Sequence, residues 1–77
     1  MTIGFVLINV SPGMEKKVFD TMMKCDEIQE LYPLFGDYDL IAKVQTSDYE
    51  GLNEIVVTKI RALQGVTETK TLTYAKL

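Results

Sequence analysis

The stretch "IQELYPLFGDYDLIAKVQT" (residues 28–46) places two apolar runs on either side of a glycine and two aspartates. Each run has the length and the β-branched or aromatic content of a strand, so we expect strands over 28–35 and 39–46. Gly36-Asp37 fits a two-residue type II′ turn that would join them as a hairpin, and a four-residue loop, which would shift the partners but keep the same faces, remains open. Pro33 has no amide proton to donate to a neighbour, which indicates that the first of these strands lies at a sheet edge.

Antiparallel pairing through this turn predicts a sheet with two different faces. It sets Pro33 opposite Leu40 on a wholly apolar face, as a sheet packed under helices requires. On the other face Glu30 falls opposite Lys43, a favourable cross-strand pair of opposite charges. This second face is half apolar, so we expect apolar surface to remain for a partner chain.

The residues before the hairpin predict a strand and then a helix. "IGFVLINV" (3–10) is apolar on both faces, which is typical of a central strand. Ser11 is the expected N-cap of the helix and Pro12 its first residue, where no amide partner is lost. The buried stripe of this helix is predicted from helical spacing to be Met14, Val18, Phe19, Met22 and Cys25.

The residues after the hairpin predict a helix and then a strand. "SDYE" (47–50) reads as a capping box, with Ser47 as N-cap and Glu50 reaching back. Gly65 is expected to end the second helix in the left-handed cap position, and residues 66–76 to form the last strand. The buried stripe of the second helix is predicted to be Leu52, Ile55, Val56, Ile60 and Leu63.

The order β-α-β-β-α-β predicts an α+β, ferredoxin-like domain. Right-handed crossovers and an edge position for the second strand favour a four-stranded antiparallel sheet of order 4-1-3-2. Both helices would cover one face of the sheet. We expect a second copy to cover the other face, as a two-fold homodimer with packing like that of dimeric α/β barrels.

Composition narrows the functional classes. The chain has 77 residues and a net charge of −3, and its eight Lys and Arg residues are scattered. We therefore expect one domain and no direct contact with nucleic acid, which needs a concentrated positive face. No apolar run approaches the roughly 20 residues of a membrane span. Cys25 is the single cysteine, which fits a reducing cytoplasm.

The residues offer little for catalysis. The chain has no histidine, and Cys25 has no second cysteine to complete a thiol or metal site. The remaining suspicious pair is Asp37 and Asp39, which could be a solvated turn, a ligand clamp, a metal site or an acid–base pair. We expect no enzyme, no catalytic residue, no bound metal and no cofactor.

Three segments carry a resemblance to a known family. They are "INVSPG" (8–13), "FGDYDLIAKV" (35–44) and "LQGVTETKT" (63–71). They contain Gly-x-x-Asp before an apolar run, then Gly-Val, and then alternating threonines, in this order. In this the chain resembles the effector domain of the Lrp/AsnC family of transcriptional regulators, also called the RAM domain, over all of residues 1–77.

The resemblance implies that the chain binds a small amino acid at an interface between dimers. Asp37 or Asp39 would pair with its ammonium group, and threonine hydroxyls and loop amides would hold its carboxylate. The homodimer would assemble further, into a tetramer or up to an octamer or decamer. The residues that the resemblance assigns to the site are Gly36, Asp37, Tyr38, Asp39, Gly65, Val66, Thr69 and Thr71.

One departure from the family pattern concerns DNA binding. Full-length members carry a helix-turn-helix domain before the effector domain, whereas the first strand here begins within three residues of Met1. We therefore expect a stand-alone RAM domain that acts by associating with a full-length regulator. Three alternatives remain open: a dimeric α+β barrel enzyme, an ACT-type amino-acid sensor, and an oligomerisation domain without a ligand.

Overall fold

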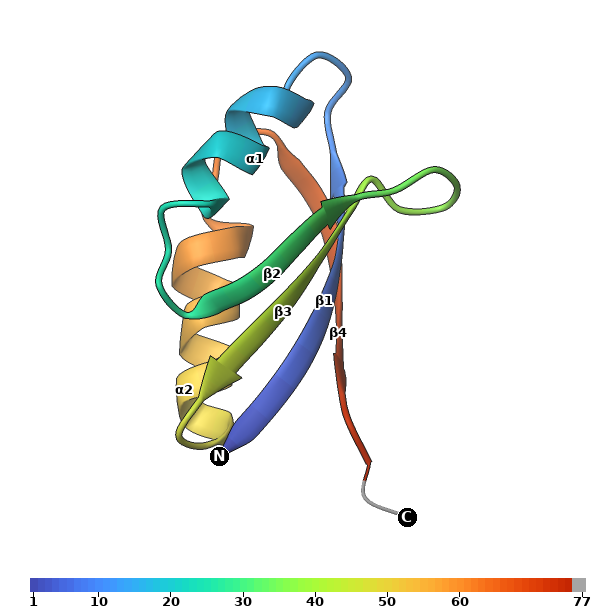
Figure 1. The fold of residues 1–77 in the computed structure, drawn as a ribbon. Coiled ribbons are helices and arrows are strands. Elements are labelled where there is room, and N and C mark those ends of the chain that lie inside the picture. The colour runs from blue at the N-terminus through green and yellow to red at the C-terminus, as the bar shows by residue number, and fades with distance from the viewer. Residues whose placement is uncertain (76–77) are drawn as a thin grey trace.

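The computed structural model describes residues 1–75 and has the predicted order of elements (Figure 1). The four strands form one antiparallel sheet of order β2-β3-β1-β4, which confirms the ferredoxin-like topology. The second helix changes its hydrogen bonding halfway and continues as a π-helical segment, η1. The elements are β1 (Thr2–Val10), α1 (Glu15–Met22), β2 (Ile28–Pro33), β3 (Leu40–Thr46), α2 (Tyr49–Ile55), η1 (Val56–Arg61) and β4 (Val66–Thr73).

Both helical units lie on the same side of the sheet, as predicted (Figure 1). Alternate residues of the strands point toward the helices and are buried there, because side chains alternate between the two faces of a strand. The core that they form with the helices consists of Val6, Ile8, Val10, Val18, Met22, Leu31, Leu40, Ala42, Val44, Leu52, Val56 and Ile60.

The register of the hairpin is as predicted, but its turn is not. Pro33 pairs with Leu40 and Glu30 with Lys43. Strand β2 ends at Pro33 and β3 begins at Leu40, so the paired segments stop further from the turn than expected. The last backbone hydrogen bond across the hairpin is donated by the Leu34 amide to the Asp39 carbonyl, at 2.8 Å. The two-residue turn at Gly36-Asp37 is therefore wrong, and residues 35–38 form a wider loop. Gly36 does have the positive φ, 117°, that a glycine permits.

The predicted cap of the first helix is also wrong. Helix α1 begins at Glu15, and its N-cap is Met14, which makes no side-chain capping bond. Ser11 instead starts a turn, in which its carbonyl accepts from the Met14 amide at 3.0 Å. The Glu15 carboxylate accepts from the Gly13 amide at 2.8 Å and so supplies the acceptor expected from Ser11. Cys25 lies beyond the end of α1, not on it.

The second helix differs from the prediction at both ends. Its N-cap is Asp48, not Ser47, and the Asp48 carboxylate accepts from the Gly51 amide at 2.8 Å. Gly65 has the expected left-handed backbone, with φ of 102°, but lies in the turn after η1. Strand β4 ends at Thr73, and residue 76, predicted as its last, lies outside the described residues.

The other side of the sheet has no cover in the part of the chain that the structure describes. Phe5, Leu7 and Ile41 are half-buried there, and Tyr32 and Leu72 have 54% and 46% of their surface exposed. We call this surface the open face. Contiguous apolar residues on an open face are typical of an interaction surface.

Candidate functional site

The C-terminal end of β1 lies between the two groups of residues that the family resemblance assigns to the site. On one side it contacts Asp39, whose amide donates to the Ile8 carbonyl at 2.9 Å. The Asp39 carboxylate accepts from the Val10 amide at 2.8 Å. The bond from the Asp39 amide therefore extends the pairing of β1 and β3 by one residue. The bond from the Val10 amide holds the Asp39 side chain in place.

On its other side β1 contacts the start of β4. The Ser11 amide donates to the Gly65 carbonyl at 2.7 Å, and Val10 pairs with Val66. Ile8 pairs with Thr69, so Thr69 points to the helix-covered side of the sheet, where it is half-buried. Thr71, two residues further, shares this side but is exposed.

The single chain does not bring the predicted site residues into one hollow. Two strand spacings, about 10 Å, separate the Asp39 side of β1 from the β4 side. Asp39 lines one hollow, whereas Val66 and Thr69 line another, of about 300 Å³, with Arg61. Gly36, Asp37, Tyr38, Gly65 and Thr71 line neither of them. The two groups of residues therefore do not share one hollow in the part of the chain that the structure describes.

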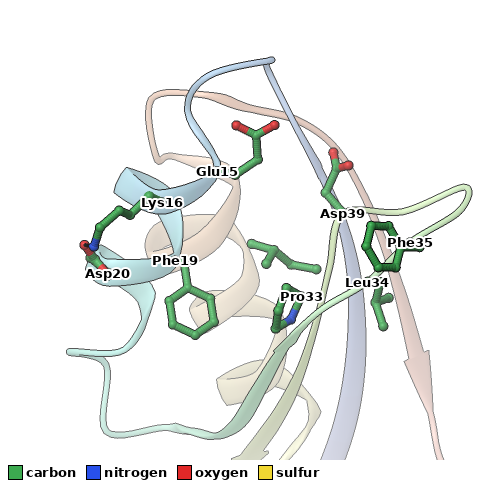
Figure 2. A pocket seen from close by; sticks show the side chains of 9 residues that line it. Glu15, Lys16, Phe19, Asp20, Pro33, Leu34, Phe35 and Asp39 are labelled. Carbon is green, nitrogen blue, oxygen red and sulfur yellow. Dashed lines mark hydrogen bonds and ion pairs between the residues drawn. The ribbon is translucent and has the colours of Figure 1, made fainter.

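The hollow at Asp39 is a groove of about 600 Å³ between α1 and the facing ends of β2 and β3 (Figure 2). Sequence reasoning assigned only Asp39 to it. Its apolar surface is provided by Phe19 of α1 and by Pro33, Leu34, Phe35 and Leu40 of the hairpin. Glu15, Lys16 and Asp20 of α1 supply the other charged groups.

Two carboxylates dominate the charge of this groove. Lys16 is paired with Asp20, at 2.9 Å between ammonium and carboxylate. The side chains of Glu15 and Asp39 lie at the same end of the groove, beside the turn that leads into α1 (Figure 2). Among residues 1–75, Lys16 is the only cation lining the groove, so this end carries uncompensated negative charge.

A sequence signal for the groove did exist. Glu15 and Phe19 are spaced i and i+4, so a helix brings them to one face, and Lys16 and Asp20 are spaced in the same way. The hairpin segment that meets this face could not be read from spacing, because it depends on how α1 packs against the end of the sheet.

A polar cluster occupies the open face at β2 and β3. The Tyr32 hydroxyl donates to the Glu30 carboxylate at 2.8 Å, and the Lys43 ammonium lies 3.3 Å from the other Glu30 oxygen. The Tyr32 hydrogen bond, followed by the bond and charge of Lys43, lowers the pKa of Glu30 below its ordinary value of 4.5. The same carboxylate raises the pKa of Tyr32 above its ordinary 10.0.

This cluster gives a prediction about acid titration. Replacing Tyr32 by Phe should raise the pKa of Glu30, because the hydroxyl bond is the largest single cause of its lowering, and Lys43→Met should raise it as well, because it removes both the bond and the charge of Lys43. A lowered carboxyl pKa stabilises the fold above pH 4.5, and this contribution is lost as the pH falls through the lowered value. Carboxyl-carbon NMR titration measures both variants, with Tyr49→Phe as control. An unchanged Glu30 pKa in Tyr32→Phe would contradict the assignment.

Cys25 is a poor candidate for a nucleophile. Its thiol is half-buried and donates to the Glu27 carboxylate at 3.2 Å. Burial, followed by this hydrogen bond, raises the pKa of the thiol above its ordinary value of 9.0. The thiolate, which is the reactive form, is therefore scarce at neutral pH.

In residues 1–75, no three His, Cys, Asp or Glu side chains gather in a way that could hold a metal ion. No helix in this part of the chain has the length and apolar character needed to cross a membrane.

Comparison with known proteins connects this geometry to a family. A family model described as the Lrp/AsnC ligand binding domain matches residues 3–76. The HTH-type transcriptional regulator FL11 of Pyrococcus abyssi is 35% identical over 74 residues, which are 96% of this chain and 48% of FL11. The chain thus spans about half the length of the curated relatives it matches.

Solved structures share the fold. The crystal structure of FFRP-DM1 is 31% identical, with a TM-score of 0.93, over 97% of this chain and all of that chain. The regulator NMB0573 of Neisseria meningitidis, solved as a complex with L-Met, has a TM-score of 0.88 over 97% of this chain and 50% of its own. Its identity is 16%, so it supports the fold alone.

Proposed function

The chain belongs to the Lrp/AsnC ligand-binding domain family, and on this premise we propose that it is a regulatory module that binds a small free amino acid. The observation that carries the proposal is the pair of contacts at the end of β1. Asp39 and Gly65 accept from the consecutive amides of Val10 and Ser11. One short segment of backbone thus holds the acidic loop and the threonine strand on its two sides.

The chemistry of these two groups suits an amino acid. Asp37 lies in an exposed loop, and Asp39 uses one oxygen for the Val10 amide, so each has an oxygen for an ammonium group. Thr69 and Thr71 offer hydroxyl donors for a carboxylate. The Neisseria regulator NMB0573 was solved as a complex with L-Met, which supports a free amino acid as the class of ligand.

Assembly is part of the proposal, because the single chain leaves the site open. We propose that two chains pack their open faces together, as in dimeric α/β barrels. Dimers then assemble further, into a tetramer or up to an octamer or decamer, and a second dimer completes the site. The half-buried Phe5, Leu7 and Ile41 support the first of these contacts, since a charged face would oppose it.

The proposed role is regulatory and not enzymatic. FL11, which matches nearly the whole chain, is named as a transcriptional regulator. The FFRP-DM1 chain is matched over its whole length and has the same fold as this domain. We propose that this domain associates with a full-length regulator in the cytoplasm and makes no DNA contact of its own.

Isothermal titration calorimetry with a panel of free amino acids, methionine included, tests the ligand. We expect saturable heat from at least one amino acid, and a loss of affinity of about tenfold or more in Asp37→Ala or Asp39→Asn, since each removes a charge-assisted bond. Asp39→Asn keeps an acceptor for the Val10 amide, so it tests charge without breaking the backbone contact.

The matched control is Asp26→Ala, which removes an exposed carboxylate from the loop before β2. It should bind as the wild type does. If no amino acid produces heat at millimolar concentrations, the ligand part of the proposal is wrong. If Asp26→Ala loses as much affinity as the loop variants, the effect belongs to net charge and the site is misplaced.

A further inference from the structure

We propose that the groove between α1 and the hairpin is a second binding site, for a small primary amine with an apolar body. The ammonium group would lie between the carboxylates of Glu15 and Asp39. The apolar body would lie along Phe19 and Leu40. This site shares Asp39 with the proposed amino-acid site but goes beyond it, because it also uses α1 and no residue of β4.

The apolar part of the groove is built from both sides. Leu40 is 2% exposed and Phe19 is half-buried, so they are held firmly by the core. Pro33, Leu34 and Phe35 form the exposed edge opposite α1 (Figure 2). A volume of about 600 Å³ falls within the range of small-molecule sites, roughly 300 to 1,000 Å³.

The charged end is held in place by the backbone. One Glu15 oxygen accepts from the Gly13 amide and one Asp39 oxygen accepts from the Val10 amide, both at 2.8 Å. These bonds orient the two carboxylates before any ligand arrives. The second oxygen of each makes no hydrogen bond to residues 1–75. An ammonium group has three donors and can serve both.

The charges also predict which ligands are rejected. An amino acid would bring its own carboxylate close to Glu15 and Asp39. The cation that could receive it, Lys16, is already paired with Asp20 at 2.9 Å. The groove should therefore prefer an amine without a carboxylate over the amino acid with the same side chain, and should reject an acid of the same shape.

NMR titration of the wild-type protein with phenethylamine, phenylalanine and 3-phenylpropionate tests this order. We expect saturable amide shifts in residues 15–20 and 34–35, which lie outside the proposed amino-acid site, with phenethylamine at millimolar concentrations. Phenylalanine should bind these residues more weakly, and 3-phenylpropionate should leave them unshifted. No saturation with phenethylamine, or equal shifts with 3-phenylpropionate, would overturn the proposal.

Two conservative variants test whether the carboxylates of Glu15 and Asp39 bind the ammonium group. Glu15→Gln and Asp39→Asn each keep an oxygen for the backbone amide and remove one carboxylate, so each should weaken phenethylamine binding by about tenfold. Glu54→Gln on α2 makes the same change of net charge away from the groove and should bind as the wild type does. Unchanged affinity in Glu15→Gln would overturn the proposal.

The same variant separates this site from the amino-acid site. Glu15 is not among the residues assigned to the amino acid, so Glu15→Gln should leave the calorimetric heats of the amino-acid panel unchanged. If the panel is silent while phenethylamine binds, the proposed function fails and the amine site stands. If Glu15→Gln weakens the amino acid and the amine equally, one site serves both and the second site is wrong.

Discussion

Replacing Gly65 by Ala should destabilise the fold by about 2 to 6 kcal/mol, a large share of the free energy of unfolding of a domain of this size. Gly65 has a φ of 102°, which side chains rarely adopt, and this strain costs about 1 to 3 kcal/mol. An added Cβ would also lie 2.9 Å from Met14 Cβ and 3.2 Å from Val18 Cγ2. Crowding of this kind costs a further 1 to 3 kcal/mol or so.

The matched control is Gly36→Ala. Gly36 has a φ of 117°, but no atom lies within 4 Å of the position of its Cβ. Backbone strain alone should therefore lower the free energy of unfolding of this variant, by about 1 to 3 kcal/mol. Denaturant unfolding at one fixed protein concentration measures both free energies of unfolding. Equal losses would show that Met14 and Val18 yield to the new methyl group and that crowding does not matter at Gly65.

The strand order and the hairpin register were predictable because many residues indicate each of them. The two apolar faces of residues 3–10 indicate a central strand, and Pro33 indicates an edge strand. With right-handed crossovers, these positions favour the strand order that the structure has. The Glu30–Lys43 pair follows from the hairpin register, which a one-residue slip would destroy by turning every side chain to the wrong face.

Single local features were less predictable, because several groups compete for each one. Ser47 is followed by Asp48, and both can cap a helix, so spacing alone does not decide between them. At α1 the Gly13 amide finds its acceptor in Glu15, which leaves Ser11 without a capping role. The turn of the hairpin widened because Asp39 is bonded to β1, a contact between residues far apart in the chain.

Only part of the candidate site was predictable, because the family pattern names residues but not their tertiary contacts. Asp39 and Thr69 could be chosen from the family pattern, and the structure attaches both of their strands to β1. That Asp39 bonds the Val10 amide depends on tertiary packing and leaves no trace in the spacing. The α1 side of the groove was missed because its residues resemble an ordinary solvated helix face.

Replacing Phe5 by Asp should weaken self-association by about 100-fold or more, because burying an unpaired charge at an interface costs several kcal/mol. Phe5 pairs with Leu72 and Lys43 and lies with Tyr32 and Ile41 around a shallow hollow of about 140 Å³ on the open face. If two copies meet through this face, the variant places two carboxylates in the contact. Sedimentation velocity over a range of concentrations measures the effect.

Phe35→Asp makes the same chemical change away from the open face. Phe35 is fully exposed in the hairpin loop, so Phe35→Asp should leave the dimer intact. The fold of Phe5→Asp can be checked by circular dichroism, since the wild-type side chain is only half-buried. A folded Phe5→Asp variant that sediments like the wild type would place the contact elsewhere. A wild type that stays monomeric at micromolar concentration would remove the contact altogether, and with it the second chain that the amino-acid site requires.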